Sequence, residues 1–156
     1  MEPTPQQLHG MYTCCVDFAK QMLADAGDFY PFGATLSPEG QMARAGAHNG
    51  DDHPPPLQLY DILAGAFAEG GKSGKFSAVA LAANVNIPAQ YSPSSPDGIR
   101  VHLECAGNAR FIYVPYTLEK TGFFKRKKKL VLGEPFAVAM VPTFFPAADT
   151  APARSD

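Results

Sequence analysis

The chain has 156 residues, of which 46% are hydrophobic and 18% charged, and its formal net charge is −2 at pH 7. This composition suits one globular domain with a core large enough to fold unaided. We find no apolar run of membrane-spanning length and no secretion signal in the N-terminal MEPTPQQLHG, so we expect a cytoplasmic protein. Three cysteines, two of them adjacent at Cys14 and Cys15, fit neither a disulfide framework nor a zinc or redox spacing, which indicates reduced thiols.

The first predicted element is a helix over residues 5–26. Thr4 has the position of an N-cap, Pro5 follows at the first helical position, and Gln7 completes a capping box. Apolar residues then recur at steps of three and four until Gly27 ends the pattern. This pattern predicts one long amphipathic helix.

Two strands and a second helix are predicted next. The aromatic and β-forming residues 30–36 (YPFGATL) and the turn SPEG at 37–40 indicate a β-hairpin with residues 41–47. After the polar loop HNGDDHPPP, apolar residues return to helical spacing, which predicts a helix from about 55 to 69 that Gly70-Gly71 stops.

The rest of the chain is predicted to be strands. From Phe76 the period is two, with Val79 and Leu81 on one face and small alanines on the other, where a helix could lie close. Residues 99–105 (IRVHLEC) and 109–116 (ARFIYVPY) form a second hairpin, and one or two edge strands follow. The domain therefore covers residues 1–145, and we expect the Pro- and Ala-rich residues 146–156 to be a disordered tail.

This order predicts an α+β domain, with a single antiparallel sheet of about five or six strands and two helices packed on it. The element order α-β-β-α-β-β-β is similar to that of roadblock or profilin-like domains. An NTF2-like cone is the alternative, in which helices cover a curved sheet and leave a pocket between them.

Three segments resemble a set of small uncharacterised bacterial α+β proteins. They are YPFGATLSPEG, AVALAANVNIP and IRVHLECAGNARFIYVPY. The shared features are an aromatic-Pro-Phe-Gly hairpin, an A-V-A-L strand and an I-x-V-x-L-E strand, spread over roughly residues 28–117. The resemblance implies one intact domain and carries no activity.

A relaxed P-loop pattern occurs at AFAEGGKSGKFS, residues 66–77. A working P-loop needs a strand before the glycine loop and a helix after it, so that backbone amides and the helix dipole converge on the phosphates. Here the helix comes first, so we interpret Gly70-Gly71 as a helix end and expect no nucleotide cofactor.

Two groups of residues could supply chemistry. His48, Asp51, Asp52 and His53 are a possible ligand set for zinc, nickel or copper, but a turn and a helix entry also explain them, and we expect no metal. On the strand 99–105, period two places Arg100, His102 and Glu104 on one face. His102 and Glu104 are low-ranked candidates for acid–base catalysis, and a solvent-exposed row of paired charges is the interpretation we prefer.

The basic run Lys125, Arg126, Lys127, Lys128 and Lys129 follows two phenylalanines. Such a run can bind nucleic acid or an anionic membrane, or it can protect a sheet edge from aggregation. Without it, 8 basic residues remain against 15 acidic ones, a net charge of −7 that would repel a polyanion elsewhere. We therefore favour edge protection and do not expect nucleic acid as a partner.

These observations favour a small non-enzymatic interaction domain, with another protein or a second copy of the chain as its partner. The alternative is a ligand-binding or enzymatic domain with a pocket between helix and sheet. Tyr30, Phe32, Tyr60, His102 and Tyr113 would line that pocket, and His102 and Glu104 would transfer protons.

Overall fold

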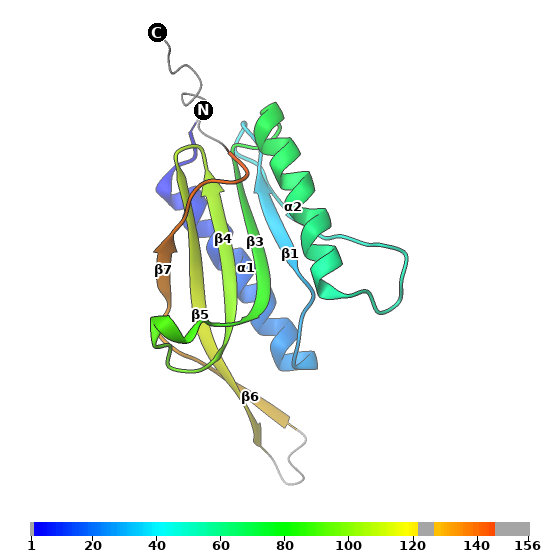
Figure 1. The fold of residues 1–156 in the computed structure, drawn as a ribbon, viewed down its shortest axis with the longest axis vertical. Helices are drawn as coiled ribbons and strands as arrows, with labels where there is room; N and C mark the ends of the chain where they lie inside the picture. The colour runs from blue at the N-terminus through cyan, green and yellow to red at the C-terminus, as the bar shows by residue number, and fades with distance from the viewer. Residues whose placement is uncertain (1, 122–126, 146–156) are drawn as a thin grey trace.

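The computed structural model describes residues 2–121 and 127–145, which form two long helices and one antiparallel sheet (Figure 1). The helices are α1 (Pro5–Ala26) and α2 (Pro56–Ser73), and a short 3-10 helix, η1, spans Ala89–Tyr91. The strands are β1 (Phe32–Leu36), β2 (Met42–Ala45), β3 (Ala78–Asn86), β4 (Asp97–Cys105), β5 (Asn108–Thr121), β6 (Lys127–Leu132) and β7 (Phe136–Ala139). The predicted α+β class and element order are confirmed, with β6 and β7 as further strands.

The sheet follows the order β2-β1-β3-β4-β5-β6, and its neighbouring strands are antiparallel. The first half of β5 pairs with β7 from Arg110 to Tyr113, and the second half pairs with β6 from Tyr116 to Thr121. Figure 1 shows α1 behind the sheet and α2 in front of it, so the molecule has three layers. This arrangement differs from a cone in which both helices cover one face of the sheet.

The first helix begins and ends where the sequence predicts. The Thr4 hydroxyl accepts a hydrogen bond from the Gln7 amide at 3.1 Å, and the Gln7 side chain accepts one from the Thr4 amide at 2.8 Å, which completes the capping box. Gly27, with a left-handed φ of 79°, ends the helix. The buried face of α1 packs on the three alanines that β3 turns toward it, at positions 78, 80 and 82, as predicted from their small size.

The predicted end of the second helix at Gly70-Gly71 is wrong. The helix continues for one more turn and ends at the left-handed Gly74. The glycine pair serves close packing instead, because a Cβ at Gly70 would meet the ring of Phe76 and a Cβ at Gly71 would meet the carbonyl oxygen of Phe144. The order of helix then strand holds, so this segment has no helix N-terminus to place against a phosphate.

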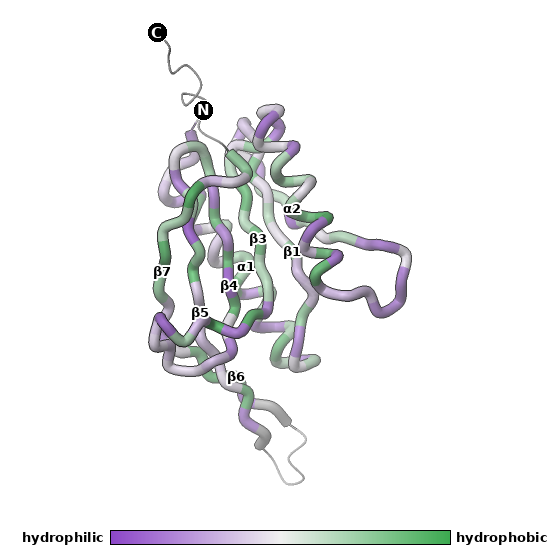
Figure 2. The backbone as a smooth tube through the Cα atoms, in the orientation of Figure 1, coloured by the Kyte–Doolittle hydropathy of each residue, from purple (hydrophilic) through white to green (hydrophobic). Residues whose placement is uncertain are grey.

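On the other side of the sheet, Leu63 and Phe67 of α2 pack on Val79 and Leu81 of β3. The ring of Phe67 fills the space that a side chain at Gly33 would need, so the glycine lets α2 approach β1. Figure 2 shows that the loop between β2 and α2 is hydrophilic, whereas β3 is mostly hydrophobic. Neither helix of the described chain has the combined length and apolarity that a membrane span requires.

Candidate functional site

The row Arg100, His102 and Glu104 lies on the α2 side of β4, but it is not the solvent-exposed row that the sequence predicts. His102 is 3% exposed and Glu104 is 1% exposed. The reason lies far along the chain. After β7, residues 140–145 turn back and cross in front of β5 and β4, and residues 143–145 cover Glu104 (Figure 1).

Five donors surround the carboxylate of Glu104. The backbone amides of Thr143, Phe144 and Phe145 donate to Oε2 at 2.9, 2.8 and 2.8 Å. The other oxygen, Oε1, lies 2.8 Å from His102 Nε2 and 3.4 Å from the Thr143 hydroxyl. We call this arrangement the Glu104 latch. It holds a segment about 40 residues away in sequence against the centre of the sheet.

The latch favours an ionised carboxylate. Burial alone would raise the pKa of Glu104, but the hydrogen bonds from His102 and from the amides of residues 143–145 outweigh it, and the pKa lies below its ordinary value. Because an ionised carboxylate only accepts hydrogen bonds, Nε2 of His102 is the atom that carries the proton and donates. The imidazole also stacks on the ring of Phe144, with centroids 4.5 Å apart.

These contacts give His102 and Glu104 a structural role. The residues that hold the latch could not be found from local pattern, since Thr143–Phe145 carry no motif and their partner is 39 to 41 residues away. A carboxylate with its oxygens occupied by buried donors has little freedom to exchange protons with a substrate. The pair therefore positions the chain after β7 on the sheet.

Beside the latch, the same face carries a cluster of aromatic rings around Arg100. We call it the aromatic surface, and its residues are Tyr60 of α2, Tyr91 of η1, Phe111 and Tyr113 of β5, Phe136 of β7 and Arg100 of β4. Tyr113 and Phe136 are stacked with centroids 5.3 Å apart, and Tyr91 lies 5.7 Å from Tyr113. Tyr113 is buried and the other five residues are partly exposed.

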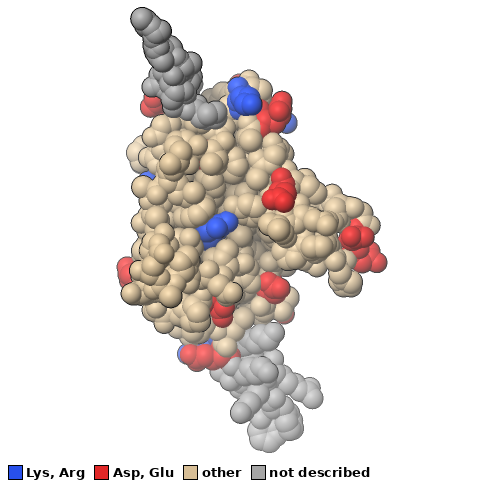
Figure 3. All heavy atoms as spheres, in the orientation of Figure 1, with Lys and Arg blue, Asp and Glu red and all other residues tan. Residues whose placement is uncertain are grey.

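Arg100 is the charged group of this surface. Its guanidinium carbon lies 4.2 Å from the ring centroid of Phe111 and 5.4 Å from that of Tyr60, and Nη2 donates to the Tyr60 hydroxyl at 2.8 Å. Among the described residues, no carboxylate lies within ion-pair distance of it, and its buried Nε atom has no hydrogen-bond partner. Figure 3 shows this face of the molecule, with one basic group near the middle, uncharged atoms around it and acidic groups toward the borders.

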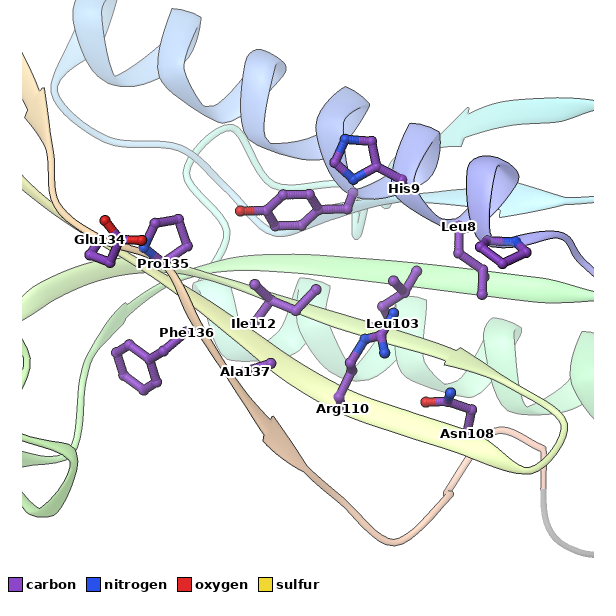
Figure 4. A pocket seen from close by; sticks show the side chains of 12 residues that line it. Leu8, His9, Leu103, Asn108, Arg110, Ile112, Glu134, Pro135, Phe136 and Ala137 are labelled. Atoms are coloured by element: carbon purple, nitrogen blue, oxygen red, sulfur yellow. The ribbon is translucent and has the colours of Figure 1, made fainter.

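A groove of about 730 Å³ lies on the opposite side of the sheet, between α1 and the edge formed by β5 and β7 (Figure 4). Leu8, His9 and Tyr12 of α1 form one wall. Its floor and the other wall are formed by Leu103, Asn108, Arg110, Ile112, Glu134, Pro135 and Ala137. Phe136 also borders the groove, but its ring stacks on Tyr113 on the other face of the sheet. No local pattern in the sequence marks this groove, because its lining residues come from α1, β4, β5 and residues 134–137.

The five residues predicted to line a helix–sheet pocket do not all lie on one side of the sheet. Phe32 belongs to the core on the α1 side, whereas Tyr60, His102 and Tyr113 lie on the α2 side. Tyr30 is 47% exposed in the connection before β1. The groove beside α1 therefore differs in place and in residues from the predicted pocket.

The candidate metal ligands His48, Asp51, Asp52 and His53 are exposed in the loop before α2. The Gly50 amide donates to Nδ1 of His48 at 3.0 Å, so this ring nitrogen takes part in a local turn. Within residues 2–121 and 127–145, no three His, Cys, Asp or Glu side chains are grouped as a metal site requires.

The basic run is described only in part. Lys125 and Arg126 lie outside the described residues, and Lys127, Lys128 and Lys129 begin β6. β6 is the last strand in the sheet order, and Lys129 is exposed opposite Glu119 of β5. Lysines at such an edge are typical of protection against strand pairing. Binding of a polyanion by this run stays a prediction.

Comparison with known proteins adds no relative. No family model matches the chain, and no curated protein or solved structure is significantly similar to it. The fold and the sites define an α+β domain with three layers, helix, sheet and helix. The Glu104 latch holds the segment after β7 on the sheet, and the aromatic surface and the groove are two candidate binding surfaces. The resemblance to small bacterial proteins stays a prediction.

Proposed function

We propose that the protein is a small non-enzymatic domain that binds another protein through its aromatic surface. The observation that carries this proposal is Arg100, a partly buried guanidinium that is surrounded by aromatic rings and has no ion-pair partner among the described residues. Tyrosine and arginine, together with tryptophan, are enriched among the residues that contribute most binding energy at the centres of protein interfaces. A partner that presents a carboxylate with apolar groups beside it would match this surface in charge and polarity.

The geometry of the latch supports a non-enzymatic role. The two side chains that could transfer protons on this face, His102 and Glu104, bind each other and the backbone of residues 143–145. The three cysteines are free thiols, which supports a cytoplasmic location for this binding domain.

The test replaces Arg100 by methionine, which keeps the length of the side chain and removes its charge. The matched control is Arg44→Met, because Arg44 also packs on an aromatic ring, that of Phe18 at 4.1 Å, but lies on β2. Proteins retained by the immobilised domain are identified, purified and titrated against the three forms. We expect a partner that binds the wild type and Arg44→Met alike and binds Arg100→Met at least tenfold more weakly.

Sedimentation of the domain alone, over a range of concentrations, decides whether the partner is a second copy. A dimer that Arg100→Met dissociates identifies the partner as the chain itself. If the binding of every purified partner is unchanged in Arg100→Met, or if no binding depends on Arg100, the proposal is wrong.

A further inference from the structure

The groove between α1 and β7 lies on the opposite face from the aromatic surface and calls for a separate explanation. Its two ends carry polar side chains of different charge, and the stretch between them is apolar (Figure 4). Arg110 and Asn108 of β5 lie at one end, and Glu134 lies at the other. Its volume of about 730 Å³ falls in the range of small-molecule sites, which is about 300–1,000 Å³.

The charge at the first end favours an anion. Arg110 is partly exposed, and no described carboxylate lies within ion-pair distance of its guanidinium. In the sheet it is paired with Leu103, so both residues face α1, and the first turn of that helix carries no acidic residue. Asn108 adds an amide two residues before Arg110 on the same strand face.

The middle of the groove is apolar. Ile112 and Leu103 form its floor, Leu8 and Tyr12 of α1 lie along one side, and Ala137 of β7 lies along the other. In the sheet, Ile112 is paired with Ala137, whose small side chain is exposed and leaves room above the strand. A ligand that reaches from Arg110 across Ile112 would therefore bury an apolar body.

We propose that this groove binds a small amphipathic carboxylate. The carboxylate accepts hydrogen bonds from Arg110 and Asn108, and the apolar body lies on Ile112 against Leu8. The acidic Glu134 at the far end disfavours a second anionic group there, so a monocarboxylate fits better than a dicarboxylate. Apart from Phe136, which borders both, this site shares no residue with the aromatic surface, and it does not depend on the partner proposed above.

The test uses octanoate as the probe and octan-1-ol as its uncharged counterpart. Each is titrated into the ¹⁵N-labelled full chain, and backbone amide shifts are followed by NMR. We expect octanoate to shift the amides of Ile112 and Ala137 in a saturable manner. A hydrogen bond to a charged group corresponds to about tenfold or more in affinity, so octan-1-ol should bind at least tenfold more weakly.

The variant Arg110→Met should weaken octanoate binding by tenfold or more, whereas Arg44→Met, on the other edge of the sheet, should bind as the wild type does. The comparison of the two probes needs no variant, so it decides the question even if Arg110→Met fails to fold. The proposal is overturned if octanoate leaves the groove amides unshifted, if octan-1-ol binds as tightly as octanoate, or if a folded Arg110→Met binds octanoate unchanged.

Discussion

Removal of the Glu104 carboxylate should release the segment that follows β7. In Glu104→Ala, the amides of Thr143, Phe144 and Phe145 lose their acceptor, and His102 loses its partner. Each buried donor that is left without an acceptor costs about 1–3 kcal/mol. Since domains are stable by only about 5–15 kcal/mol, this variant should lose a large part of its free energy of unfolding.

The variant Glu104→Gln removes the charge of the side chain and keeps its shape. Its carbonyl oxygen can occupy the place of Oε2 and keep the three amide bonds, while its NH₂ group meets the donors that Oε1 accepted. We expect a loss of about 1–3 kcal/mol, the difference between charged and neutral hydrogen bonds together with one unmatched donor. Glu69→Gln on the exposed face of α2 is the control, and should change stability by less than about 0.5 kcal/mol.

The pH dependence of this loss has a definite sign. The pKa of Glu104 is lowered in the folded state, so its contribution is fully present above the pKa of the unfolded carboxyl, about 4.3. It is lost as the pH falls through the folded pKa. The part of the stability difference between the wild type and Glu104→Gln that comes from the carboxylate charge should therefore be present above the pKa of the unfolded carboxyl and shrink as the pH falls below it.

Urea unfolding followed by circular dichroism gives these free energies, and hydrogen exchange reports on residues 143–145 directly. Their amides should be protected in the wild type and exchange faster in both Glu104 variants. If Glu104→Ala unfolds within about 1 kcal/mol of the wild type and these amides keep their protection, the latch does not hold the segment and our reasoning is refuted.

Two further predictions concern packing and thiol chemistry. Gly33→Ala should destabilise the protein by about 1–3 kcal/mol in urea unfolding, because the added methyl meets the Phe67 ring and the backbone of β3. Gly65→Ala, in open space on α2, should stabilise it by about 0.5–1 kcal/mol. Equal effects of the two substitutions would refute the close approach of α2 to β1. Burial raises the pKa of the Cys15 thiol to about 12, so in the native protein at pH 8 a thiol reagent should modify the partly exposed Cys14 and spare Cys15 until unfolding. Rapid modification of both thiols would contradict the packing of α1.

Local signals in the sequence were enough for most of the elements. The capping box at Thr4, the turn before Gly40 and the change to period two after Phe76 each depend on residues within a few positions of one another. Such signals act through local backbone conformation, so they can be recognised without knowledge of the rest of the chain. They predicted both ends of α1 correctly and the order of the helices and strands along the chain.

The errors arose where distant segments meet. A glycine pair after a helical pattern usually ends the helix, but Gly70 and Gly71 are helical and the helix ends at Gly74. The pair has a packing role that no local pattern shows, because Phe76 and Phe144 occupy the space that side chains at these positions would need. Alternation along 99–105 identified the shared face of Arg100, His102 and Glu104, yet it could not say that residues 143–145 cover Glu104 on that face. The polarity of a strand residue predicts exposure only when no other segment supplies its hydrogen bonds.

The Glu104 latch and the aromatic surface are in contact, so a substitution in one can affect the other. Glu104 binds His102, the His102 ring lies 5.2 Å from that of Phe111, and Phe111 carries the guanidinium of Arg100. A change at Glu104 can therefore alter partner binding by loosening this contact chain, without touching the partner. Arg100→Met leaves the donors to Glu104 in place. If it binds the partner more weakly while the amides of residues 143–145 keep their protection from hydrogen exchange, the loss of binding comes from the aromatic surface itself.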